Sequence, residues 1–179
     1  MKIALSLVLG VFPFLSSCSE PHVYQWGRMT QIGELPCFSV ADSEETRRTP
    51  PKLAALVIEG LKKGQRAQVV WNLTFVGEQE VQLPPTECIP YGDSSRGVKA
   101  WPDTAPPLQA GVVYTYSFNS DIPAAYADGS LANRVYAGDF CLTRDSEGHA
   151  TFHEIRWDEK AKKRHWEVCE LAPEQVPTY

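Results

Sequence analysis

Cysteine is the residue type in this chain with the widest possible chemistry, because a thiol can pair, bind a metal, act as a nucleophile or carry a lipid. The 179-residue sequence contains five of them: Cys18, Cys37, Cys88, Cys141 and Cys169. Because five is odd, intramolecular disulfides cannot use them all. At least one cysteine therefore needs a separate explanation.

Cys18 ends a segment that is typical of a bacterial lipoprotein signal peptide. Lys2 is followed by an apolar run over residues 3–15, which is too short to span a bilayer. The run ends in Leu15-Ser16-Ser17-Cys18, an aliphatic residue, two small residues and the cysteine of a lipobox. We predict that residues 1–17 are a signal peptide, that Cys18 is lipidated, and that 18–22 are a lipidated tether. The alternative is an ordinary cleaved signal peptide with a spare cysteine.

The residue after this cysteine bears on the membrane to which the protein is sorted. An Asp at that position is the usual inner-membrane retention signal, whereas Ser19 resembles an outer-membrane sorting signal. We expect a protein of the bacterial envelope that is lipid-anchored, faces the periplasm and sits at the outer membrane. Several acyl chains anchor a protein far more firmly than one.

The other four cysteines predict two disulfides, because the periplasm is oxidising. Three pairings are possible, and we favour Cys37–Cys88 with Cys141–Cys169 because each joins neighbouring parts of the chain. A zinc site is disfavoured, since no two cysteines have the C-x2-C spacing. We expect no metal, no cofactor and no free catalytic thiol.

Other residue patterns do not predict an enzyme. His149 and His153 would share one face of a helix, but their segment is predicted to be a turn and a strand. Neither lies in an H-E-x-x-H motif. Ser94 and Ser95 lie outside any G-x-S-x-G motif, and a glycosidase would need two carboxylates held across a cleft.

The elements that would position these residues are short strands. The alternation of apolar and polar residues and the content of β-branched and aromatic residues predict these strands. Loops rich in Pro and Gly connect them. Segment 52–60 has Ala and Leu suited to a helix, yet it follows two prolines and ends at a glycine, which favours a strand. The predicted strands are 22–32, 36–40, 52–60, 68–75, 112–118, 134–142, 151–157 and 164–171, with a short segment at 87–92.

This pattern predicts an all-β fold, an antiparallel immunoglobulin-like β-sandwich stabilised by disulfides. The sandwich domain would cover 23–171, and 172–179 would be a flexible tail with two prolines. Loops are expected at 42–51, 92–107 and 121–133, and a charged turn at 158–163. The net charge of −5 argues against a nucleic-acid-binding protein.

Two of the predicted loops carry residues suited to partner binding. Loop 92–107 contains Arg96, Lys99 and Trp101, and loop 121–133 contains Tyr126 and Asp128. Loops on a rigid scaffold often carry recognition, and Trp, Tyr and Arg contribute most at interfaces. The alternative is that Trp101 and Tyr126 fold back onto the core.

Several short motifs, taken in order and spacing, resemble those of the type VI secretion immunity periplasmic lipoproteins. The resemblance covers most of the predicted mature chain. The motifs are the lipobox, Pro36-Cys37-Phe38, Glu87-Cys88-Ile89-Pro90, Leu108-Gln109-Ala110-Gly111 and Val168-Cys169-Glu170.

The resemblance implies a non-enzymatic protector that binds a cognate effector, a toxin delivered into the periplasm, and occludes its active site. Because the chain is acidic, we expect a basic patch around the cleft of that effector. Two alternatives stay open. One is an inhibitor of a lysozyme-like hydrolase, and the other is a structural or envelope-assembly lipoprotein.

Overall fold

The structure of the chain is a computed structural model, and it describes residues 23–61, 66–75, 77, 80–123 and 132–170. The predicted signal peptide, the tether with Cys18 and the tail 172–179 lie outside the described residues.

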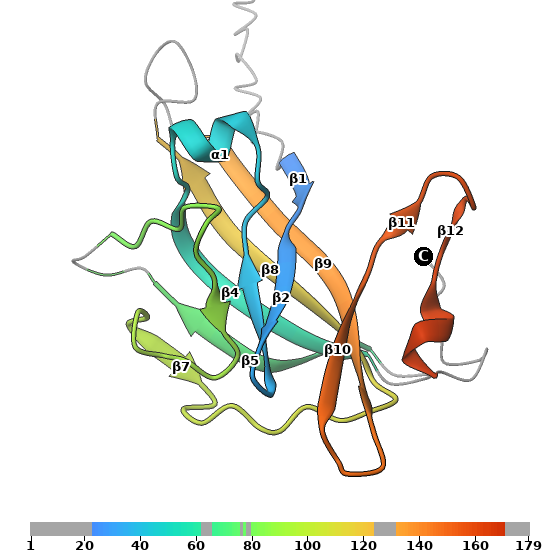
Figure 1. The fold of residues 1–179 in the computed structure, drawn as a ribbon. Helices are drawn as coiled ribbons and strands as arrows, with labels where there is room; N and C mark the ends of the chain where they lie inside the picture. The colour runs from blue at the N-terminus through green and yellow to red at the C-terminus, as the bar shows by residue number, and fades with distance from the viewer. Residues whose placement is uncertain (1–22, 62–65, 76, 78–79, 124–131, 171–179) are drawn as a thin grey trace, which may run out of the picture.

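The fold is all-β and is built on one seven-stranded sheet (Figure 1). Along the sheet the order is β1-β9-β8-β4-β5-β7, and β10 also pairs with β9. The strands are β1 (Val23–Trp26), β4 (Lys52–Leu61), β5 (Gln68–Thr74), β7 (Lys99–Trp101), β8 (Val113–Ile122), β9 (Ala132–Arg144) and β10 (Ala150–Ile155).

The predicted antiparallel pairing holds throughout this sheet except at one edge. There β1 runs parallel to β9, with Val23 beside Arg134 and Trp26 beside Ala137. A parallel pair needs a long connection, and here most of the domain separates the two strands. The chain leaves β1 at Gly27 and enters a second sheet, so β1 has no hairpin partner of its own.

The second sheet lies across one face of the large sheet, as Figure 1 shows. It contains β2 (Arg28–Ile32), β3 (Leu35–Ser39) and β6 (Ile89–Pro90). The chain ends with a small hairpin, β11 (Trp157–Asp158) and β12 (Lys163–Arg164), followed by a 3₁₀ helix, η1 (Trp166–Cys169). This C-terminal hairpin stands at the side of the molecule.

The main core lies between the two sheets. Tyr114, Tyr116 and Phe118 alternate along β8 and are all buried, as the period of two predicts. From the small sheet, the ring of Phe38 lies 4.9 Å from that of Tyr116 and 5.4 Å from that of Phe140. Fully burying an apolar side chain of this size stabilises the fold by about 1.5–3 kcal/mol.

A smaller core cluster lies on the opposite face of the large sheet, under the C-terminal hairpin. Val113 and Cys141 are the neighbours of inward-facing Tyr114 and Phe140, so they project to that opposite face. There they pack with Ile155, Trp166 and Cys169. The hairpin and η1 thus cover part of a sheet face that would otherwise be open.

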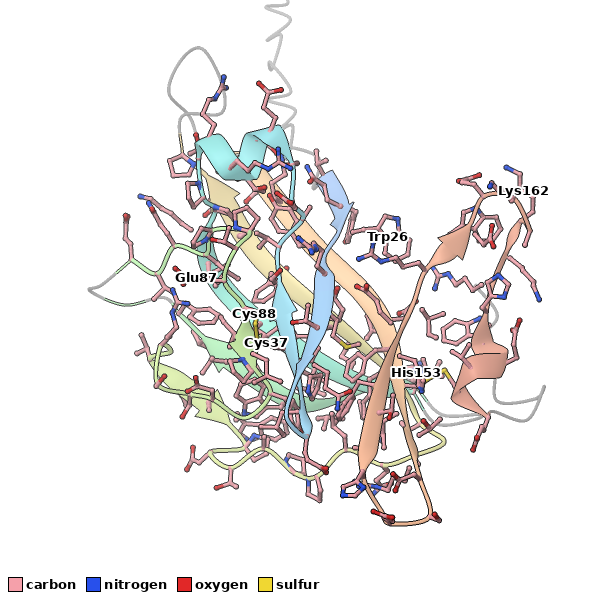
Figure 2. The ribbon with its side chains drawn as sticks, viewed as in Figure 1. Trp26, Cys37, Glu87, Cys88, His153 and Lys162 are labelled. Atoms are coloured by element: carbon pink, nitrogen blue, oxygen red, sulfur yellow. A yellow bond between two sulfur atoms is a disulfide. The ribbon has the colours of Figure 1, made fainter. Side chains whose placement is uncertain are left out.

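The two disulfides have the pairing that we favoured from the sequence. Cys37 of β3 is bonded to Cys88, just before β6, and this bond is visible in Figure 2. Cys141 of β9 is bonded to Cys169 of η1. One bond ties the small sheet together, and the other fastens the C-terminal segment to the large sheet.

Two predicted loops contain regular structure. Loop 42–51 contains a helix, α1 (Glu44–Arg48), which begins at a capping box formed by Ser43 and Thr46. Five residues are too few to show a helical period, so the sequence pattern predicts only a loop here. Loop 92–107 contains β7, which pairs with β5 through Asn72–Trp101 and Thr74–Lys99.

The predicted strand 164–171 is wrong in its main part. Among residues 164–170, which the structure describes, only Arg164 belongs to a strand, and the chain then turns into η1. A straight strand would carry Trp166 and Cys169 away from β9. The Cys141–Cys169 bond and the burial of Trp166 require the chain to turn back instead.

Candidate partner-binding site

Three of the five residues predicted to bind a partner lie in the described part of the structure, all within segment 96–101. Arg96 donates hydrogen bonds to Glu87 Oε2 (2.8 Å) and to the carbonyl of Gln82 (3.1 Å). It therefore connects its loop to the segment that precedes it. Lys99 and Trp101 lie on the edge strand β7, and Trp101 is 60% exposed rather than folded onto the core. Tyr126 and Asp128 lie outside the described residues.

A different set of residues forms an aromatic groove on the large sheet. The groove encloses about 360 Å³ between β1, β9 and the C-terminal hairpin. In Figure 2 Trp26 lies between β1 and that hairpin. The residues that we call the aromatic groove are Tyr24, Trp26, Thr115, Ala137, Asp139 and Arg164.

One wall of the groove comes from β1. Tyr24 and Trp26 are two residues apart on a strand, so both side chains project to the same face. Tyr24 is 73% exposed and Trp26 is 45% exposed. The residue beside Trp26 on β9 is the small Ala137, which also lines the groove.

The polar end of the groove is a buried acid whose partners include Thr115 and Arg164. Asp139 is buried, accepts a hydrogen bond from Thr115 Oγ1 (2.8 Å) and forms an ion pair with Arg164. A buried carboxylate without such partners would be strongly destabilising. The pair therefore fixes Arg164 on the groove floor and joins β9 to β12.

Arg164 also contacts two indole rings. Its guanidinium carbon lies 5.4 Å from the ring centroid of Trp26 and 6.0 Å from that of Trp166, within the range of a cation–π interaction. Because Trp26 belongs to β1 and Trp166 to η1, Arg164 links the two walls of the groove. The rings and the guanidinium are thus held in place rather than left mobile.

The hairpin that forms the second wall is held by a histidine between two acids. His165 Nε2 lies 3.0 Å from Asp158 Oδ2, and its Nδ1 lies 2.7 Å from Glu167 Oε1. The hydrogen bond to Asp158, and then that to Glu167, raises the pKa of His165. The pKa of Glu167 falls to about 2, first through the hydrogen bond of its own backbone N–H and then through His165 and Lys163.

The histidines considered for catalysis do not converge. His149 lies in the β9–β10 turn with Nδ1 3.1 Å from Asp145 Oδ2, and His153 lies on β10 with Nε2 2.9 Å from Thr143 Oγ1. Their segment is the turn and strand that we predicted. Among the described residues, no group of three or more His, Cys, Asp or Glu side chains is placed to hold a metal ion.

Sequence reasoning missed the aromatic groove for a physical reason. The sequence predicts a strand over 22–32, but the pattern does not say which face of that strand is covered. Asp139 and Arg164 lie 25 positions apart and meet only because η1 folds back onto β9. The available signal was the Tyr24-Gln25-Trp26 triplet, two large aromatics on one side of a short strand.

Comparison of the chain with protein-family models, with curated proteins and with solved structures finds no match. Within the described ranges, no helix has the length and apolar character needed to cross a membrane.

Proposed function

We propose that this protein is a lipid-anchored, periplasm-facing immunity protein that binds and neutralises an antibacterial effector, acting by binding and not by catalysis. The observation that carries the proposal is the aromatic groove. It brings together exposed Tyr24 and Trp26 with Arg164, and Tyr, Trp and Arg are the residue types that contribute most at protein interfaces. The contact between Arg164 and Trp26, and the ion pair of Arg164 with Asp139, hold two of the three side chains in position, which lowers the entropy cost of binding.

The disulfides and the short predicted tether support a location in the periplasm, close to a membrane. Two disulfides suit an oxidising compartment, which the periplasm provides. From Cys18 to Val23 an extended chain spans at most roughly 17 Å, so the groove would be held close to the membrane. The outer membrane, indicated by Ser19, is the anchoring membrane in this proposal. An effector in the periplasm would meet its inhibitor there.

The immunoglobulin-like β-sandwich is part of the same proposal. It is supported by the two sheets that face each other across the aromatic core of Phe38, Tyr116 and Phe140. An experimental structure that matches the strand connectivity of immunoglobulin domains would establish it, and a different connectivity would replace it.

The test uses a toxin encoded beside this chain's gene, exported to the periplasm of a host bacterium with or without this protein. We expect the full chain to prevent killing. Tyr24→Ala/Trp26→Ala should weaken binding to the purified toxin at least about thirtyfold, since hot-spot truncations cost about 2 kcal/mol or more. Both side chains are substantially exposed, so the variant should keep its fold, which circular dichroism checks.

Trp101→Ala is the matched variant, because it removes another exposed indole, from the loop predicted to bind. If Trp101→Ala abolishes protection and Tyr24→Ala/Trp26→Ala does not, the aromatic groove is not the interface. Killing that persists at full expression of the unaltered protein contradicts the immunity function. Inhibition of purified lysozyme, or envelope defects in a deletion strain without any toxin, would favour the alternatives named above.

A further inference from the structure

A second cleft lies at the end of the sheet farthest from the tether, and we call it the distal cleft. It encloses about 420 Å³ between the β2–β3 turn, the segment 103–108 and the β9–β10 hairpin. Arg134 of β9 lies beside Val23, and Arg144 at the end of the same strand lines the cleft. At about 3.4 Å per residue, these two positions are roughly 34 Å apart.

The walls of the distal cleft are largely apolar. Tyr91 and Leu108 are buried in them, Phe152 is half-buried, and Leu35 is 44% exposed at the mouth. Beside Leu35 in the β2–β3 hairpin lies Ile32, which is 55% exposed. Exposed aliphatic side chains that border a cleft are typical of an interaction site.

Hydrogen bonds hold the cleft in shape. Tyr91 donates to the carbonyl of Pro106 (2.7 Å). Gln31 Nε2 donates to the carbonyls of Gly33 (2.8 Å) and Ala150 (2.9 Å), and Gln31 Oε1 accepts from the N–H of Phe152 (3.0 Å). The cleft is therefore formed before any ligand arrives, which reduces the cost of binding.

The charges at the mouth favour a cation. Glu34 and Asp103 are exposed at the lining, and within the described residues neither carboxylate has an ion-pair partner. Arg144, the basic residue of the lining, donates to the carbonyl of Gly148 (2.7 Å), which holds its guanidinium at the β9–β10 turn. The chain as a whole carries −5.

We propose that the distal cleft binds a segment of the effector in which an aromatic side chain is followed by Lys or Arg. The ring enters the apolar cleft beside Tyr91 and Phe152, and the cation meets Glu34 and Asp103 at the mouth. This inference rests on the proposed function for the identity of the partner. Such a contact would face away from the membrane, where a periplasmic protein approaches.

Three short peptides test the chemistry without the effector: acetyl-Trp-Arg-amide, acetyl-Trp-Gln-amide and acetyl-Ala-Arg-amide. Each is titrated into the ¹⁵N-labelled full chain, purified from the envelope in detergent, and followed by NMR. We expect acetyl-Trp-Arg-amide to bind about fivefold more tightly than either of the others. Its shifts should centre on Glu34, Leu35, Asp103 and Phe152.

Glu34→Gln/Asp103→Asn should lower the affinity for acetyl-Trp-Arg-amide to that for acetyl-Trp-Gln-amide. The control Glu44→Gln/Glu170→Gln makes the same charge change at exposed positions outside the cleft and should change nothing. Equal affinity for the three peptides, shifts centred elsewhere, or no effect of the first variant overturns the inference. If the peptides bind but no effector does, the proposed function fails and the cleft stands.

Discussion

At the residue scale, Tyr116 is packed tightly on every side: it is fully buried, and two glycines lie against its ring. Its buried hydroxyl donates to Glu154 Oε1 (3.0 Å), and the ring lies against the backbone of Gly138. A Cβ on Gly138 would lie 2.6 Å from the Tyr116 hydroxyl oxygen. Gly138→Ala should therefore lower the free energy of unfolding by about 2 kcal/mol, as overpacked cores do.

Urea denaturation measures this loss. The control is Ala137→Ser, one position along the strand but on the opposite face, and it should stay within about 0.5 kcal/mol of the unaltered protein. A Gly138→Ala variant as stable as the parent would mean that Tyr116 has room to move, which its full burial argues against.

The same residues show what sequence could and could not predict. The alternation that put Tyr114, Tyr116 and Phe118 on one face was visible, because a strand has a period of two. The need for glycine at 138 was not, because it depends on a ring from the neighbouring strand. For the same reason the sequence predicts a strand that contains Tyr24 and Trp26, but not that Arg164 lies beside them.

At the element scale, the Cys141–Cys169 disulfide decides whether the aromatic groove has a second wall. The bond closes a loop of 28 residues, for which the chain-entropy model gives about 3–4 kcal/mol. Cys141→Ala/Cys169→Ala should release η1 and the hairpin from β9 and weaken effector binding.

Hydrogen exchange measures the release. Protection should fall selectively in β12 and η1, while β4 and β8 in the middle of the large sheet keep theirs, since their core lies on the other face. A uniform loss of protection across the domain would show instead that the bond supports the whole fold.

The hairpin should also respond to pH through His165. Hydrogen bonds to Asp158 and Glu167 raise the pKa of His165 in the folded chain. The stability that His165 contributes to the folded chain is therefore fully present below 6.5, the ordinary pKa of histidine. The contribution is lost as the pH rises through the folded pKa. An NMR titration of the His165 ring should give a pKa above 6.5.

The control is Glu167→Gln, which removes one of the two acids and should bring the pKa of His165 back toward 6.5 without restoring it fully, because Asp158 remains. A titration midpoint at or below 6.5 in the unaltered protein would contradict the geometry of this hairpin.

The elements that sequence predicted are those whose own pattern determines them. β4, β5, β8 and β9 carry long apolar or alternating runs, and each appears close to its predicted range. α1, β7 and η1 do not have such patterns. β7 is three residues long and exists because β5 offers an edge, and η1 exists because Cys169 must reach Cys141.

At the scale of the whole molecule, β9 connects both proposed contact sites. Ala137 lies in the aromatic groove and Arg144 lies in the distal cleft. Seven residues of extended strand separate them by roughly 24 Å. None of the described residues lines both sites, so one partner that spans this distance could use the two independently.

Independence has a measurable consequence for effector affinity. Substitutions farther apart than about 7–10 Å, without shared partners, usually add in free energy within 0.3–0.5 kcal/mol. Titration calorimetry should compare Tyr24→Ala/Trp26→Ala, Glu34→Gln/Asp103→Asn and the two combined. We expect the factor by which the combination weakens binding to equal the product of the two separate factors, within about twofold.

A combined loss no larger than that of the groove variant alone would mean that the effector does not reach the distal cleft. A loss far above the product would mean that the strand transmits strain between the two sites, and that the domain does not act as a rigid scaffold.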